Sequence, residues 1–170
     1  MSTTTTTEQP RQAVAASLPT LTLGDLARMS IEELDVVYEL SFTPAVAALH
    51  GPLDGLPLAG NEKDPVRIAE VWKGKVFAPL SPTVGYGTNR IVKDGQKIYE
   101  FEFRYTPAKP LQGTTPVIAL DYALPLNPPP VQAILDNLKQ VNGQLFLGTA
   151  NQKTAKGFKF LLYFGLQYPG

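Results

Sequence analysis

The alternation of aromatic and charged residues over residues 97–105, K-I-Y-E-F-E-F-R-Y, constrains the fold of this chain most strongly. Successive residues of a β-strand point to opposite faces of the sheet. The stretch therefore predicts a strand with one aromatic face and one charged face. The aromatic face holds Tyr99, Phe101, Phe103 and Tyr105, and the charged face holds Glu100, Glu102 and Arg104. Such a strand suits a sheet between two environments, either core and solvent or an apolar shell and a polar cavity.

The later part of the chain predicts a mainly antiparallel β fold. Asp94-Gly95 is a strong signal for a tight hairpin turn between residues 88–92 and 97–105. The segment 158–168, F-K-F-L-L-Y-F-G-L-Q-Y, is apolar on nearly both faces, which is typical of a strand inside a sheet. The further predicted strands are 69–78, 115–122 and 143–150. Six strands with short turns favour a strongly curled sheet or a small β-barrel.

Helical signals come mainly before these strands. Short helices are predicted from Thr22 and, through the capping box of Ser30 and Glu33, from residue 31 to about Leu40. One short late helix is predicted over residues 131–140, where apolar residues recur at helical spacing. We therefore expect one compact domain organised as a disordered tail at 1–20, a helical lead-in and wrapping loop at 21–65, and an antiparallel barrel at 66–170.

Composition excludes several classes of function. Fifteen basic residues balance fifteen acidic ones, and no basic stripe indicates nucleic acid as a partner. The sequence holds no cysteine and one histidine, which argues against thiolate chemistry and against a metal site within one chain. We expect no cofactor. No stretch reaches the roughly 18 apolar residues that span a bilayer, so we expect no membrane span and a cytoplasmic protein.

Candidate catalytic residues come from the charged row. Glu100, Glu102 and Arg104 could line a polar cavity, where a desolvated carboxylate could act as a general acid or base. The alternative is a solvated sheet face on which the same charges contribute little. Tyr122 could add a phenol, whereas its neighbour Asp121 is expected to hydrogen-bond the following turn.

If the aromatic row faces inward instead, it becomes a wall for a ligand. The candidate ligand-binding residues are Trp72, Tyr86, Tyr99, Phe101, Phe103, Phe146 and Phe160. Trp72 is also a natural core residue. The G-Y-G of residues 85–87 lacks the lysine and the spacing of a phosphate-binding loop, and is interpreted as a hinge or flap.

A helical lead-in followed by a strand with the chain's single tryptophan resembles the lipocalins and the wider calycin barrels. The matching residues are E-V-W-K-G at 70–74, Asn89-Arg90, and the closing F-L-L-Y-F-G-L, within residues 66–168. The resemblance implies a barrel closed at one end by the tryptophan, often against an arginine. This chain differs in carrying Gly74 two residues after the tryptophan, where the family has a glycine two residues before it.

Three functions remain open from the sequence. The first is binding of a small hydrophobic molecule, such as a lipid, polyketide or pigment, in a barrel cavity. The second is a cofactor-independent cyclase or isomerase that acts on such a substrate with carboxylate, arginine or tyrosine groups. The third is an interaction module that uses residues 51–65 and the N-terminal helices to form a homodimer.

Overall fold

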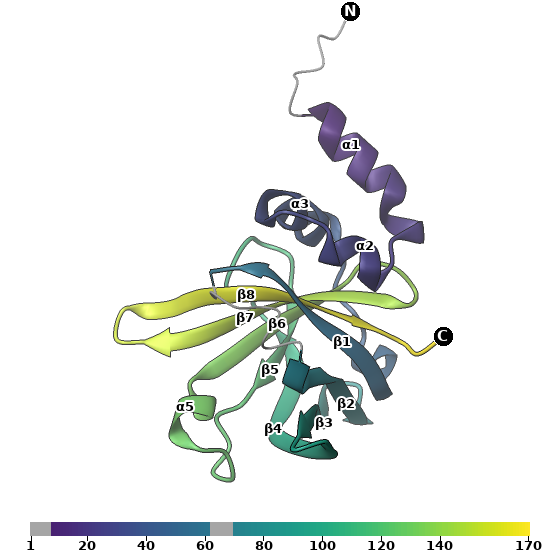
Figure 1. Ribbon diagram of the computed structural model, residues 1–170. Coiled ribbons are helices and arrows are strands. Elements are labelled where there is room, and N and C mark those ends of the chain that lie inside the picture. Colours follow the sequence, from purple (N-terminus) through teal and green to yellow (C-terminus); the bar gives the residue numbers. More distant parts are fainter. Residues whose placement is uncertain (1–7, 62–69) are drawn as a thin grey trace, which may run out of the picture.

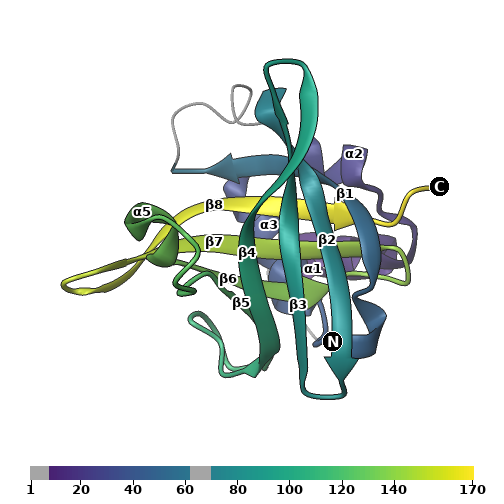
Figure 2. The ribbon, with the colours of Figure 1, turned by 90° about the horizontal axis from the view of Figure 1, so that it is seen from below.

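The computed structural model describes residues 8–61 and 70–170. In this part of the chain, eight antiparallel strands close into a barrel in sequence order, and the last strand pairs with the first (Figures 1 and 2). The strands are β1 (Gly51–Gly60), β2 (Trp72–Ser81), β3 (Val84–Lys93), β4 (Gln96–Ala108), β5 (Val117–Asp121), β6 (Ile134–Gln140), β7 (Leu145–Thr154) and β8 (Gly157–Gln167). The mainly antiparallel β fold is confirmed, and the sheet is closed.

The predicted hairpin at Asp94-Gly95 joins β3 to β4. Both residues have positive φ, 51° at Asp94 and 75° at Gly95. Two consecutive residues of this kind form the type I′ turn, whose twist matches that of the flanking strands. The turn sets the register in which Lys93 pairs with Gln96 and Ile91 with Ile98.

A β-bulge interrupts β4 and divides its aromatic row. The register shifts so that Asn89 lies opposite Glu100 whereas Gly87 lies opposite Phe103, and Phe101 takes the positive φ of 62°. An extra residue in one strand reverses the alternation of faces on either side of it. Phe101 and Phe103 consequently lie inside the barrel, whereas Tyr99 is on the outside and 65% exposed. The prediction of one continuous aromatic face is therefore wrong at Tyr99.

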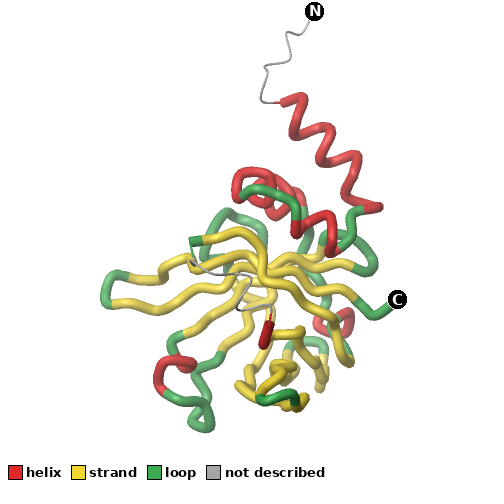
Figure 3. Tube along the Cα trace, viewed as in Figure 1, coloured by secondary structure: helices red, strands yellow, loops and turns green. Residues whose placement is uncertain are grey.

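Of the N-terminal helices, α2 (Leu23–Ala27) and α3 (Ile31–Leu40) lie against the outside of the barrel, whereas α1 (Glu8–Ser17) contacts α3 and projects away from the barrel (Figures 1 and 3). Helices α2 and α3 both begin with a capping box, formed by Thr22 with Asp25 and by Ser30 with Glu33. These helix starts agree with the sequence prediction. Helix α1 precedes a 3₁₀ turn at Leu18–Thr20, and a second 3₁₀ turn spans Val46–Ala48.

Two apolar clusters stabilise this arrangement. The first lies in the barrel interior and includes Leu53, Phe103 and Leu138. The second lies between the helices and the outer face of the sheet, and includes Leu34 of α3 and Leu147 of β7. Strands under the helices are thus buried on both faces, which explains why β8 has so few polar residues.

The predicted wrapping loop before residue 66 is wrong over Gly51–Gly60, because these residues form β1, and residues 62–65 lie outside the described residues. Glycine and proline commonly interrupt regular secondary structure, but in β1 they fit the close contacts and the irregular pairing of a barrel strand. A Cβ at Gly55 would lie 2.6 Å from the ring of Trp72. Pro57, which has no N–H, lies beside a register shift in the ladder between β1 and β8, where proline is tolerated.

The predicted short late helix is present, but its predicted extent over residues 131–140 is wrong. Only Pro129–Gln132 is helical, as α5, and β6 follows from Ile134. Apolar side chains occur on both faces of this strand because the interior covers one face and other elements cover much of the second. An apolar run of that kind fits helical and strand spacing equally well.

The organisation along the chain differs from the sequence prediction in two further places. The barrel begins at Gly51 rather than at residue 66, because β1 pairs with both β2 and β8. The predicted tail at 1–20 contains α1, so it is not without structure. Residues 1–7, and the predicted boundary at residue 66, lie outside the described residues. No helix among the described residues has the length and apolarity to cross a membrane.

Candidate ligand-binding cavity

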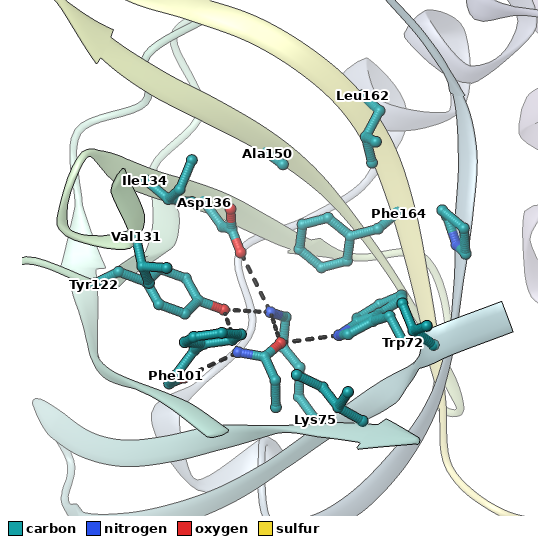
Figure 4. A pocket seen from close by; sticks show the side chains of 14 residues that line it. Trp72, Lys75, Phe101, Tyr122, Val131, Ile134, Asp136, Ala150, Leu162 and Phe164 are labelled. Carbon is teal, nitrogen blue, oxygen red and sulfur yellow. Dashed lines mark hydrogen bonds and ion pairs between the residues drawn. The ribbon is translucent and has the colours of Figure 1, made fainter. Parts of the chain in front are cut away.

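A cavity of about 370 Å³ opens inside the barrel. Most of its wall is apolar and comes from strands all around the barrel. The apolar lining includes Trp72, Ile91, Phe101, Ile134, Leu162 and Phe164 (Figure 4). Val71, which is 47% exposed, lies on the solvent side of the same cavity. Apolar walls and a volume of this size are typical of sites for small molecules.

Four polar side chains interrupt the apolar wall and contact one another. They are Lys75 of β2, Asn89 of β3, Tyr122 directly after β5, and Asp136 of β6. Each is buried, with 3% to 6% of its surface exposed. Because buried polar groups are costly unless they find partners, a cluster of this kind inside a barrel calls for a chemical explanation. We refer to these four residues as the polar cluster.

A β-bulge in β2 brings Trp72 and Lys75 to the same face. Residues three apart in a regular strand point to opposite sides, but the register with β3 shifts between Trp72 and Gly74. Gly74 has φ of 132°, and a Cβ there would lie 2.1 Å from the backbone oxygen of Leu53. Glycine at this position therefore permits both the indole and the lysine to enter the cavity.

Two partners fix the orientation of the Asn89 amide. The indole Nε1 of Trp72 can only donate, and it donates to Oδ1 of Asn89 at 2.9 Å. The backbone oxygen of Phe101 can only accept, and it accepts from Nδ2 at 2.9 Å. Asn89 Oδ1 therefore accepts from Nζ of Lys75 at 2.9 Å, while Nδ2 donates to the hydroxyl of Tyr122 at 3.0 Å.

Tyr122 accepts a second hydrogen bond from Lys75, with 2.5 Å between Nζ and the hydroxyl oxygen. Its own hydroxyl hydrogen is consequently directed away from Asn89. Burial raises the pKa of Tyr122 well above its ordinary value, and the charge of Asp136 raises that pKa further. Tyr122 is therefore a neutral phenol at ordinary pH, and its one hydrogen is directed to the Asp136 carboxylate.

Lys75 and Asp136 form a buried ion pair, with 3.4 Å between Nζ and Oδ2. Burial lowers the pKa of Lys75 and raises that of Asp136, and each partner opposes the effect of burial on the other. Oδ1 of Asp136 is buried without a hydrogen-bond partner. Burial thus favours the neutral form of both groups, which lowers the cost of moving a proton from Lys75 to Asp136.

Aromatic rings surround the lysine nitrogen. Nζ of Lys75 lies between 5.1 and 5.4 Å from the ring centroids of Trp72, Phe103, Tyr122 and Phe164. Rings at such distances attract a cation but supply no counter-charge. The nitrogen is therefore buried among aromatic rings, and Asp136 is its carboxylate partner within the described residues.

Some of the residues proposed from the sequence meet at this cavity. Trp72, Phe101 and Tyr122 line it, and the ring of Phe103 packs 5.4 Å from that of Tyr122. Asp121 accepts a hydrogen bond from the Ala123 backbone N–H at 2.9 Å, as expected for a residue that holds the turn.

The other proposed residues lie elsewhere. Glu102 and Arg104 are exposed on β4, because the bulge turns Phe101 and Phe103 inward and leaves the charged positions outside. Glu100 is half-buried and is not part of the cavity lining. Tyr86 is 43% exposed, and Tyr99 points outward. Two further residues are packed: Phe146 in the interior against Tyr168, and Phe160 in the outer cluster against Tyr163.

Sequence reasoning missed Lys75, Asn89 and Asp136. The signal for Asp136 is a charge inside the apolar run V-Q-A-I-L-D-N-L, which an interpretation as an amphipathic helix assigns to the polar side. Lys75 follows Lys73 in W-K-G-K-V, and only the bulge at Gly74 separates an exposed lysine from a buried one. Among the described residues, no three His, Asp or Glu side chains gather in a way that could hold a metal ion.

One solved structure resembles this barrel. The crystal structure of a protein from Thermomonospora curvata aligns with a TM-score of 0.54 over 95% of this chain and 99% of that chain, at 15% sequence identity. This likeness shows the fold alone. No family model matches the sequence, and no curated protein matches it. The closed eight-stranded barrel is compatible with the calycin-like architecture that the sequence resembles.

Proposed function

We propose that this protein binds a small, mainly apolar molecule in the barrel cavity. The observation that carries the proposal is a space of about 370 Å³ with apolar walls and one buried polar cluster. Ligand sites commonly combine extensive apolar contact with a few polar groups that orient the ligand. A filled barrel would have no need of a buried lysine, whose desolvation costs stability.

The charge of the cluster restricts the ligand. Lys75 and Asp136 compensate each other, so an ionised ligand would bring an unpaired charge into an apolar space at high cost. A neutral molecule with one polar group avoids this cost. The three Nζ hydrogens of Lys75 already have acceptors in Asn89, Tyr122 and Asp136. The Tyr122 hydroxyl, by contrast, can turn from Asp136 to donate to a ligand. The expected polar group is therefore an acceptor such as a carbonyl oxygen.

Trp72 provides a direct test, because it is the only tryptophan of the chain and lines the cavity. Titration with 2-undecanone and cinnamaldehyde should change its emission in a saturable manner. Ala150→Phe, which places a ring in the cavity, should weaken binding at least tenfold. Leu80→Ser, at a residue 69% exposed on β2 and outside the cavity lining, is the matched control and should bind as the parent does.

Two results would contradict binding in the cavity. One is an emission spectrum that no apolar probe changes while the protein remains folded by circular dichroism. The other is an Ala150→Phe variant that is folded and binds with the affinity of the parent protein.

The polar cluster favours a second candidate function, cofactor-independent acid–base catalysis on the same kind of molecule. Tyr122 is a neutral phenol able to donate a proton to a substrate oxygen, and Asp136 carries an oxygen without a partner. A cyclase or isomerase needs such a pair in a water-poor site. With an identified substrate, Tyr122→Phe should lower kcat at least a hundredfold and weaken binding by a much smaller factor. Glu102→Gln tests the alternative that the charged row of β4 does the chemistry, and unchanged turnover would exclude it.

A further inference from the structure

We infer that Lys75 binds carbonyl ligands covalently, as an imine between its Nζ and the carbonyl carbon of an apolar aldehyde or ketone. This inference rests on the proposed function and specifies its chemistry. The geometry that carries it is a lysine nitrogen at the wall of an apolar cavity, enclosed by four aromatic rings, with a carboxylate and a phenol in contact.

A lysine reacts as a nucleophile only when its amine is unprotonated. Amines in water are almost fully protonated at neutral pH, and burial in an apolar site is the usual way in which proteins free the lone pair. The burial of Lys75 acts in this direction and lowers its pKa. Asp136, at 3.4 Å, is the nearby base that can take the proton.

The second buried lysine of the chain shows that burial alone is insufficient. Lys139 is also 3% exposed, but it lies on the face of β6 that is directed at α3. Its Nζ donates to the backbone oxygen of Tyr38 at 3.0 Å and lies 4.4 Å from the Tyr38 ring centroid. Lys139 is no part of the apolar barrel cavity. The two lysines are therefore equally buried, but only Lys75 lines the cavity in which the ligand would bind.

The reaction needs no proton donor or acceptor outside the polar cluster. Lys75 first transfers a proton from Nζ to Asp136, which leaves a neutral amine and a neutral acid. The amine lone pair attacks the carbonyl carbon, and an Nζ proton moves to the former carbonyl oxygen to give a carbinolamine. Asp136 returns its proton to that hydroxyl, which leaves as water. The products are a protonated imine paired with the Asp136 carboxylate and one water molecule, so the charge of the site is unchanged.

Tyr122 has a positioning and donating role in this sequence. Its oxygen lies 2.5 Å from Nζ, so a carbonyl that approaches the nitrogen also approaches the phenol. The hydroxyl hydrogen pairs with Asp136 while that group is a carboxylate. Once Asp136 has taken the proton of Lys75, this hydrogen can turn to polarise the carbonyl oxygen as the carbon–nitrogen bond forms.

The experiment is reductive trapping of the full chain with cinnamaldehyde and sodium cyanoborohydride at pH 7.5, followed by intact mass and peptide mapping. The expected result is one secondary amine at Lys75 that carries the cinnamyl group. Cinnamyl alcohol, which has the same shape but no carbonyl, should give no adduct. Lys139 and the exposed lysines in the same sample are internal controls. Adducts spread over them at the level found at Lys75 would overturn the inference.

Lys75→Arg keeps a cation in the cavity but cannot form an imine, and should lose the adduct. If this variant does not fold, the peptide map of the wild-type protein still tests the inference, because it compares Lys75 with the other lysines of one folded protein. Trp72 emission separates the two proposals. Cinnamaldehyde that changes the emission without forming a Lys75 adduct overturns the imine and leaves binding intact. Absence of both signals overturns the proposed function as well.

Discussion

Lys75 and Asp136 face each other inside the barrel from strands that are not neighbours, with 3.4 Å between Nζ and Oδ2. Both side chains are buried, each with 4% of its surface exposed. Removing one partner of a buried ion pair leaves an uncompensated charge and typically costs about 3 to 5 kcal/mol. Replacing both partners with apolar residues removes that cost.

We therefore predict that Asp136→Leu lowers the free energy of unfolding by about 3 kcal/mol. The double variant Lys75→Met/Asp136→Leu should be substantially more stable than Asp136→Leu alone. Urea denaturation of the parent, both single variants and the double variant gives the coupling energy directly. Additive effects of the two substitutions would show that the charges do not interact.

The bulge at Gly74 should be as important to the cavity as the residues that line it. Gly74→Ala would place a methyl group 2.1 Å from the Leu53 backbone oxygen, at a φ of 132° that other residues rarely adopt. We predict a loss of about 3 kcal/mol or more in the free energy of unfolding, together with a red shift of Trp72 emission.

Gly143→Ala is the matched control, because no atom lies within 4 Å of a Cβ at that glycine. It should change the free energy of unfolding by less than about 1 kcal/mol. A Gly74→Ala variant with parental stability and emission would show that the strand can place Trp72 and Lys75 inside without the bulge.

The Asn89 amide should hold the other members of the polar cluster in place. Its removal leaves the Trp72 indole and the Phe101 backbone oxygen without partners, and takes one acceptor from Lys75. Each buried group left unsatisfied costs about 1 to 3 kcal/mol. We predict that Asn89→Leu destabilises the protein by about 3 kcal/mol in urea denaturation and alters Trp72 emission. Unchanged emission would contradict the assigned bond to the indole.

The sequence allowed prediction of those parts of the fold that depend on local signals. The Asp94-Gly95 turn, the helix start at Thr22 and the capping box at Ser30 are formed by neighbouring residues, and each is present as expected. β1 and β6 were missed because their character depends on distant partners. Gly55 makes room for Trp72, and β6 is covered on both faces, so neither shows the alternation of a half-buried strand.

The site was harder to predict than the fold because two β-bulges determine which side chains point into the cavity. Strict alternation assigns Tyr99 to the same face as Phe101 and would send Trp72 and Lys75 to opposite faces. An extra residue at Phe101 and another at Gly74 reverse both assignments. A bulge depends on the pairing register with the next strand, which a single sequence does not contain.

Alkaline pH should destabilise the protein through its buried tyrosines. Burial raises the pKa of Tyr38 to about 12, from 10.0, and also raises those of Tyr105 and Tyr163. Between pH 10 and 12 the unfolded chain releases these protons whereas the folded chain keeps them, so the free energy of unfolding falls as pH rises. Burial lowers the pKa of Lys75 in the folded protein. This group therefore makes the free energy of unfolding rise with pH, but only below about pH 10.5, the ordinary pKa of lysine.

For Tyr38 alone the expected loss between pH 9 and pH 11.5 is about 2 kcal/mol. Tyr38→Phe should therefore show a smaller decrease over this range than the parent protein, measured by urea denaturation at both pH values. Tyr99→Phe is the matched control, since Tyr99 is 65% exposed on the outer face, and should leave the decrease unchanged. An equal decrease in the parent and in Tyr38→Phe would show that the Tyr38 phenol ionises as readily in the folded protein as in the unfolded chain. In that case the contact between α3 and the barrel would admit water at high pH.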